Sequence, residues 1–132
     1  MTSTLKPHQV LIHANENRRD VLASKLETAD TLVSRTKGLL GRQELPTGEG
    51  LWIKRCNSIH TFFMKFAIDA VFVDRNLKVV AVHRDLKPWR VTWPHLRATS
   101  VFELPSGTLR SASDLEVGAH LVIEAKGDEA RG

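Results

Sequence analysis

The 132-residue sequence has little of several features that define common protein classes. Its single cysteine, Cys56, excludes an internal disulfide framework and a zinc site built from several cysteines. No apolar run approaches the roughly 18–20 residues that a membrane-spanning helix requires. The first twenty residues contain no apolar segment followed by a small-residue cleavage site, which a signal peptide would need. We therefore expect a cytoplasmic protein that does not insert into a membrane.

The sequence also has no strong excess of one charge. It carries 19 Lys and Arg against 15 Asp and Glu, a net charge of +4. The basic side chains are scattered rather than gathered in runs, which is typical of a solvated surface and does not favour nucleic acid as the partner. A composition of 42% hydrophobic and 26% charged residues is ordinary for one globular domain.

We divide the chain into an N-terminal extension (1–20), one globular domain (21–125) and a polar tail (126–132). Apolar and β-branched patterning predicts strands at 21–27, 51–55, 100–104 and 117–125, and a hairpin formed by 67–74 and 77–85. Asp30 is a candidate N-cap for a short amphipathic helix over 30–42. Pro88 and Pro94 exclude a regular element between 86 and 97. These elements predict an α+β, β-rich fold, with a compact, mostly antiparallel, barrel-like sheet and one or two short helices.

Five sequence blocks, in this order, resemble the family called domain of unknown function 192. They are RTKGLLGR (35–42), GLW (50–52), HTFFMKFAIDAVFVD (60–74), VFELPSGT (101–108) and VGAHLVI (117–123). The resemblance implies a compact β-rich domain and no settled biochemical activity. The central block departs from the commoner family pattern, because Phe63 replaces the Trp before Met64, and Phe66 and Ala67 replace the Asn-Thr after Lys65.

Cys56, His60 and Met64 are spaced four residues apart, and all three are ligands that a soft metal such as Cu(I) accepts. On a strand, Cys56 and His60 would lie about 13 Å apart, and only a loop or bend would let all three residues converge. The alternatives are a Cu(I) or Zn site, a thiol-dependent protein, or a buried Cys56 and Met64 beside a hydrogen-bonded His60. The last interpretation is favoured, so we predict no cofactor, with a Cu(I) or Zn ion as the alternative.

Charged residues in and near the apolar blocks form a second candidate set. Asp69 and Glu103 lie within apolar runs, and a buried carboxylate needs a partner or acquires a raised pKa. The two would form an acid/base pair if they converged, or structural ion pairs if each met a cation such as Arg35, Arg42 or Lys65. Arg35 and Arg42 could bind an anionic ligand from one side of the predicted helix.

The segment 84–97 places Trp89 and Trp93 among basic side chains. Aromatic and cationic side chains together are used to bind single-stranded nucleic acid, a sugar or a protein partner, but two tryptophans in a proline-bounded loop also commonly cover a small core.

From these observations we predict a non-catalytic domain that binds an unidentified small or anionic ligand or a protein partner. The alternatives are a Cu- or Zn-binding or thiol-dependent protein and a weak nucleic-acid binder acting through 84–97. The candidate ligand-binding residues are Arg35, Arg42, His60, Lys65, Asp69, Trp89, Trp93 and Glu103.

Overall fold

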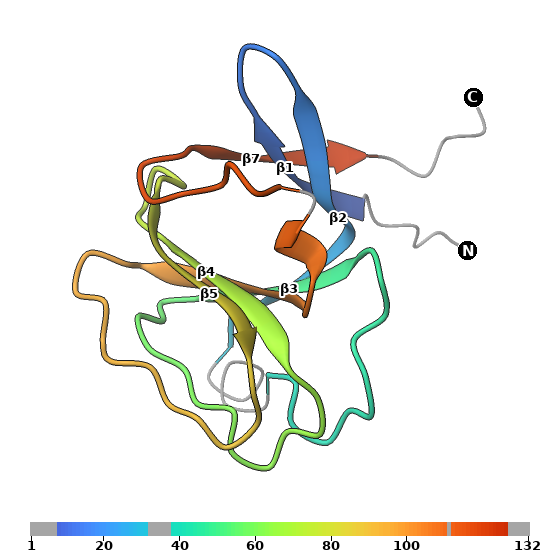
Figure 1. Cartoon of the computed structure of the whole chain (residues 1–132), viewed down its shortest axis with the longest axis vertical. Helices are drawn as coiled ribbons and strands as arrows, with labels where there is room; N and C mark the ends of the chain where they lie inside the picture. Colours follow the sequence, from blue (N-terminus) through green and yellow to red (C-terminus); the bar gives the residue numbers. More distant parts are fainter. Residues whose placement is uncertain (1–7, 32–37, 111, 127–132) are drawn as a thin grey trace.

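The computed structural model describes residues 8–31, 38–110 and 112–126. They form one sheet in the order β5-β4-β6-β3-β2-β1-β7. The strands are β1 (His8–Ala14), β2 (Arg19–Ala29), β3 (Glu49–Lys54), β4 (Ile68–Val73), β5 (Val79–Leu86), β6 (Ser100–Pro105) and β7 (Leu121–Lys126). Only β2 and β3 pair in parallel; every other pair in this order is antiparallel. The sheet curls into a half-barrel, with β1, β2 and β7 at one end and the long loops at the other (Figure 1).

The β-rich, mostly antiparallel character predicted from the sequence is confirmed, but the α+β class with one or two short helices is not. The described residues contain one 3₁₀ helix, η1 (Thr108–Arg110), and no α-helix. The predicted helix over 30–42 extends into residues 32–37, which lie outside the described residues. Its last part forms a turn, in which Gly38 and Gly41 adopt positive φ angles. No helix in the described part of the chain is long and apolar enough to cross a membrane.

The predicted hairpin of 67–74 with 77–85 is confirmed as β4 and β5, and the strands predicted near 21–27, 51–55 and 100–104 correspond to β2, β3 and β6. We did not predict β1, which lies in the segment assigned to an N-terminal extension and pairs with both β2 and β7. Its sequence, HQVLIHA, has a short apolar run without alternation, so it lacks the signal of a half-buried strand.

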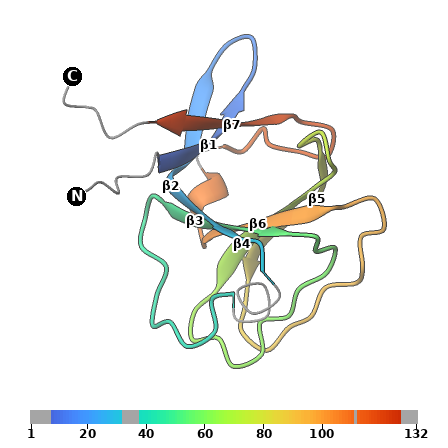
Figure 2. The ribbon, with the colours of Figure 1, turned by 180° about the vertical axis from the view of Figure 1, so that it is seen from behind.

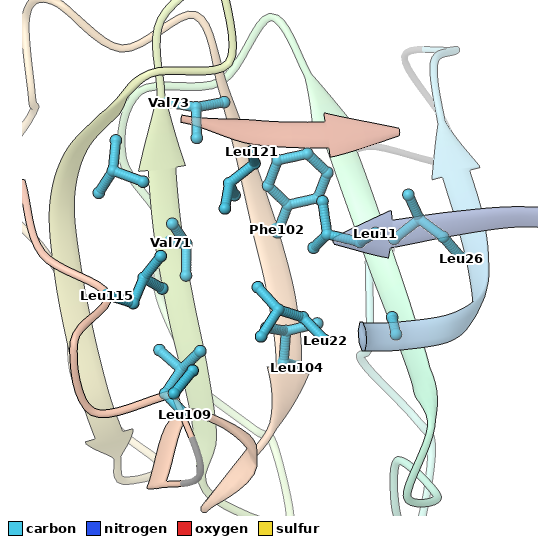
Figure 3. Close-up of a cluster of buried hydrophobic side chains, with 13 residues drawn as sticks. Leu11, Leu22, Leu26, Val71, Val73, Phe102, Leu104, Leu109, Leu115 and Leu121 are labelled. Atoms are coloured by element: carbon cyan, nitrogen blue, oxygen red, sulfur yellow. The ribbon is translucent and has the colours of Figure 1, made fainter. Parts of the chain in front are cut away.

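Two hydrophobic clusters lie on opposite faces of the sheet. The first occupies the inside of the curl, where Leu109 and Leu115, from the chain after β6, pack toward Val71 and Leu104 (Figure 3). The second lies between the other face and the long loops, and includes Ala70, Phe72, Ile59 and Met64. Because β4 contributes to both clusters, all six of its residues are buried.

The close packing of β3 between β2 and β6 explains the glycine of the GLW block. A Cβ atom at Gly50 would lie 2.9 Å from Leu104 Cδ2 and 3.1 Å from Ala23 Cβ, closer than carbon atoms pack. Glycine at this position therefore leaves room for the side chains of Leu104 and Ala23, which pack over β3.

Candidate functional site

A cavity of about 230 Å³ lies beneath the long loops, on the sheet face of the second hydrophobic cluster. Four parts of the chain form it: the turn at 38–40, β3, the loop after β3, and β6. The view in Figure 2 shows the long loops at the end of the molecule away from β1 and β7. The described residues that line the cavity are Gly38, Leu39, Leu40, Ile53, Cys56, Ser58, Ile59, His60, Met64 and Glu103.

Among the described residues that line this cavity, Glu103 is the only one with a carboxylate. Its side chain is 4% exposed, and its Oε1 atom has no hydrogen-bond partner among the described residues. Burial raises the pKa of the Glu103 carboxyl to about 7, and the Arg42 guanidinium opposes this rise. The cavity therefore contains a carboxyl group that exchanges its proton near neutral pH and has an oxygen available for a ligand.

Asp69, the other carboxylate in an apolar run, lies on the opposite face of the sheet. Asp69 pairs with Leu104 and Ala70 pairs with Glu103 in the β4–β6 ladder, and successive side chains alternate between faces. The Asp69 carboxylate accepts hydrogen bonds from the backbone N–H groups of Asp85 (2.8 Å) and Leu109 (2.9 Å). The two carboxylates therefore do not converge as an acid/base pair, and Asp69 connects β4 to β5 and η1.

The structure brings Cys56, His60 and Met64 to the same cavity, at the bend that follows β3. The Cys56 thiol donates a hydrogen bond to the Ser58 carbonyl oxygen at 3.1 Å, and His60 Nδ1 accepts one from the Phe62 backbone N–H at 3.2 Å. Cys56, His60 and Glu103 are not a group of ligand atoms within 4.8 Å of one another in the described part of the chain. The three soft-metal candidates thus line one cavity.

Of the three predicted cations, the structure describes Arg42 and Lys65, and neither of these two lines the cavity. The Arg42 guanidinium donates to Glu27 Oε1 at 2.9 Å, and the Lys65 side chain is exposed. Arg35 lies outside the described residues. The described lining residues include the Glu103 carboxyl and no arginine or lysine, and this carboxyl can accept a hydrogen bond from a ligand.

An exposed aromatic surface, formed by Phe62, Phe63 and Trp89, adjoins the cavity. The Trp89 ring centroid lies 4.7 Å from that of Phe63 and 5.9 Å from that of Phe62, and the His60 ring contacts Phe62 at 5.1 Å. Because His60 also lines the cavity, the aromatic surface continues from its edge. Trp93, at 86% exposed, does not cover the core.

Thr61, which sequence analysis did not single out, connects the two loops that carry the aromatic surface. Its hydroxyl donates to the Lys87 carbonyl oxygen (2.7 Å) and accepts from the Arg90 N–H (2.8 Å), while its carbonyl accepts from the Trp89 N–H (2.9 Å). Phe63 and Trp89 both have positive φ angles, of 67° and 65°, a strained conformation for bulky residues. A threonine inside an aromatic block was the available signal, but its partners are 26 and 29 residues away.

The family profile described as DUF192, Uncharacterized ACR, matches residues 12–123, so the chain belongs to this family. A UPF0127 protein of Pyrococcus horikoshii is 36% identical over 74% of this chain and 86% of its own length. Another, from Pyrococcus abyssi, is 37% identical over 79% of this chain and 90% of its own length. A crystal structure of a protein of unknown function from Novosphingobium aromaticivorans has a TM-score of 0.73 at 20% identity, and the match covers 86% of this chain and 83% of that one. This structural match is evidence for the fold alone.

Proposed function

We propose that this protein is a non-catalytic domain that binds a small organic ligand in the Glu103 cavity. The observation that carries this proposal is the buried Glu103 carboxyl, whose Oε1 atom has no hydrogen-bond partner in the described part of the chain. An unsatisfied buried acceptor is costly, and a bound donor removes that cost. The ligand class is a small ammonium or other hydrogen-bond donor with an apolar body.

The dimensions and walls of the cavity set the rest of the ligand's chemistry. A volume of about 230 Å³ is below the roughly 300–1,000 Å³ of pockets for drug-sized molecules, so it suits a ligand of few heavy atoms. Leu39, Leu40, Ile53 and Met64 give apolar contacts to the ligand body. The aromatic surface beside His60 offers a place for any part of the ligand that extends beyond the cavity.

The test is an NMR titration with n-butylammonium, using n-butanol as the uncharged probe of the same shape. We expect n-butylammonium to shift the amide resonances of the cavity residues, more strongly at pH 8 than at pH 6, because an ionised Glu103 attracts the cation. Glu103→Gln keeps the shape and removes the charge, and is expected to lower the affinity at least tenfold. Glu44→Gln, a change at an exposed carboxylate outside the lining, is the matched control. Equal binding by the wild type and Glu103→Gln, or no shift at cavity residues, contradicts the proposal.

The aromatic surface favours a second candidate function, the binding of single-stranded nucleic acid. Trp89 is 56% exposed and Phe63 is 70% exposed, and the exposed Lys65, Lys87 and Arg90 lie next to them in the sequence or two residues away. Exposed rings among cations stack on bases and attract phosphates. The measurement is anisotropy of a labelled oligothymidine at two salt concentrations. Binding that weakens steeply with salt and is lost in Trp89→Ala supports this candidate, and binding that is absent or independent of salt contradicts it.

A further inference from the structure

Three potential metal ligands meet near the turn of the hairpin formed by β1 and β2. His13 of β1 directly opposes Asp20 of β2, so their side chains project from the same face. Asp114 approaches them from the turn that follows η1. One ligand atom from each residue, a ring nitrogen of His13 and a carboxylate oxygen of each aspartate, lies within 4.8 Å of the other two.

The buried imidazole of His13 is the feature that distinguishes this group from an ordinary surface ion pair. His13 is 4% exposed, and its Nδ1 atom has no hydrogen-bond partner among the described residues. The distance from Nδ1 to Asp114 Oδ1 is 4.0 Å, which is too long for a hydrogen bond. A buried ring nitrogen therefore faces two carboxylates without reaching either, as expected where a cation binds between them.

The surrounding contacts orient one of the carboxylates and leave the group open to solvent. The Asn15 side-chain amide donates to Asp114 Oδ2 at 2.9 Å, and its own Oδ1 accepts from the backbone N–H groups of Asn17 and Arg18. The turn of the hairpin thus fixes Asn15, which positions Asp114. The side chain of Asp114 is 41% exposed, which gives an ion access and lets the carboxylate move toward it.

We propose that His13, Asp20 and Asp114 bind a divalent first-row transition metal ion of the Zn²⁺ type. One imidazole nitrogen with two carboxylate oxygens suits this class, because Mg²⁺ and Ca²⁺ are bound by oxygen ligands. The two carboxylates neutralise the charge of the ion, and three protein ligands leave a coordination position for water. Arg18, whose Nε lies 3.1 Å from Asp20 Oδ2, then shares the Asp20 carboxylate with the ion.

The test is calorimetric titration of the tag-free protein with Zn²⁺, supported by the visible absorption of bound Co²⁺. We expect one ion per chain, and at least tenfold weaker binding in Asp114→Asn and in Asp20→Asn. Glu116→Gln changes a nearby exposed acid outside the group, and is expected to bind like the wild type. Cys56→Ala is also expected to bind like the wild type, because Cys56 is not part of this group.

Loss of Zn²⁺ in Cys56→Ala, or unchanged binding in both aspartate variants, overturns the proposal, as does the absence of stoichiometric binding in the wild type. A second measurement needs no variant and so does not depend on whether a substituted chain folds. In the ¹⁵N spectrum of the wild-type histidine rings, Zn²⁺ is expected to shift His13 Nδ1. A Zn²⁺-induced shift at another histidine, with none at His13, contradicts the assignment.

Discussion

Asp69 and Glu103 are two carboxylates in neighbouring strands, both fully enclosed, yet their surroundings differ completely. On one face of the sheet, Asp69 accepts two backbone hydrogen bonds. On the other face, Glu103 has an unpartnered oxygen beside a cavity and a pKa raised to about 7. Burial alone therefore does not distinguish a carboxylate that stabilises the fold from a candidate ligand-binding carboxylate. The hydrogen bonds that each carboxylate makes or lacks are what distinguish them.

The largest effect is expected from Asp69→Ala. The change leaves the N–H groups of Asp85 and Leu109 without acceptors, and we expect a loss of about 4 kcal/mol in the free energy of unfolding. Asp69→Asn keeps one acceptor oxygen, so its loss in the free energy of unfolding is expected to be about half that of Asp69→Ala. Urea denaturation measures both. A loss below about 1 kcal/mol for Asp69→Ala would show that Asp69 does not stabilise the fold in this way.

Glu103→Gln is expected to raise the free energy of unfolding at pH 8, whereas Asp69→Ala lowers it. The folded pKa of about 7 is above the ordinary value of 4.5, so the folded chain holds more protons than the unfolded chain between these values. Stability from this group is fully present below pH 4.5 and is lost as the pH rises through 7, by about 3 kcal/mol in all. Glu103→Gln removes this dependence and is expected to be more stable than the wild type at pH 8.

The measurement is urea denaturation of both proteins from pH 4 to pH 8.5. The difference in stability between wild type and Glu103→Gln should change across the window from pH 4.5 to 7 and stay constant above it. A difference that does not vary with pH would mean that Glu103 is ionised and satisfied in the folded protein, as Asp69 is satisfied by its two donors.

Thr61 extends the comparison to a buried hydroxyl. Thr61→Val keeps the shape of the side chain and removes the bonds to Lys87 and Arg90, so we expect a loss of about 1–2 kcal/mol. The loops of the aromatic surface should also exchange their amide hydrogens faster. Ser58→Ala, in the same loop, is the control, because Ser58 accepts the hydrogen bond from Cys56 with its backbone carbonyl oxygen. Equal stability of Thr61→Val and the wild type would contradict this role.

Much of the fold could be predicted from local sequence, because strands such as β4 and β5 carry continuous apolar and β-branched runs around a short turn. Strand β1 could not, since its short apolar run does not alternate with polar residues and its partners, β2 and β7, include the distant last strand of the chain. The described C-terminal part of the helix expected over 30–42 is a turn rather than a helix, and two glycines in this turn adopt positive φ angles.

The candidate site was predictable in its residue types and less so in its geometry. The sequence indicated Cys56, His60, Met64 and Glu103, and these residues line one cavity. It could not separate Glu103 from Asp69, because both lie in similar apolar runs. The donors that satisfy Asp69 are 16 and 40 residues away, and one of them, the N–H of Asp85, is presented by a residue with a φ angle of 56° at an irregularity in the β4–β5 ladder.

The smallest effect is expected from Arg42→Gln, and it concerns the pKa of Glu103. The Arg42 guanidinium lowers the pKa of Glu103, in opposition to burial, so its removal should raise that pKa by less than about one unit. Arg55→Gln, which changes a guanidinium bonded to Asp30, is the control. The Glu103 side-chain ¹³C resonance reports the shift, and a downward shift in Arg42→Gln would contradict the assignment.

The most direct test of the account is the titration of the wild-type Glu103 carboxyl, followed by its side-chain ¹³C resonance with and without n-butylammonium. We predict a midpoint near pH 7 that falls when n-butylammonium binds, because the ion stabilises the ionised carboxylate. A midpoint near 4.5, unchanged by the ammonium, would show that Glu103 is satisfied within the fold and that the cavity is not a binding site.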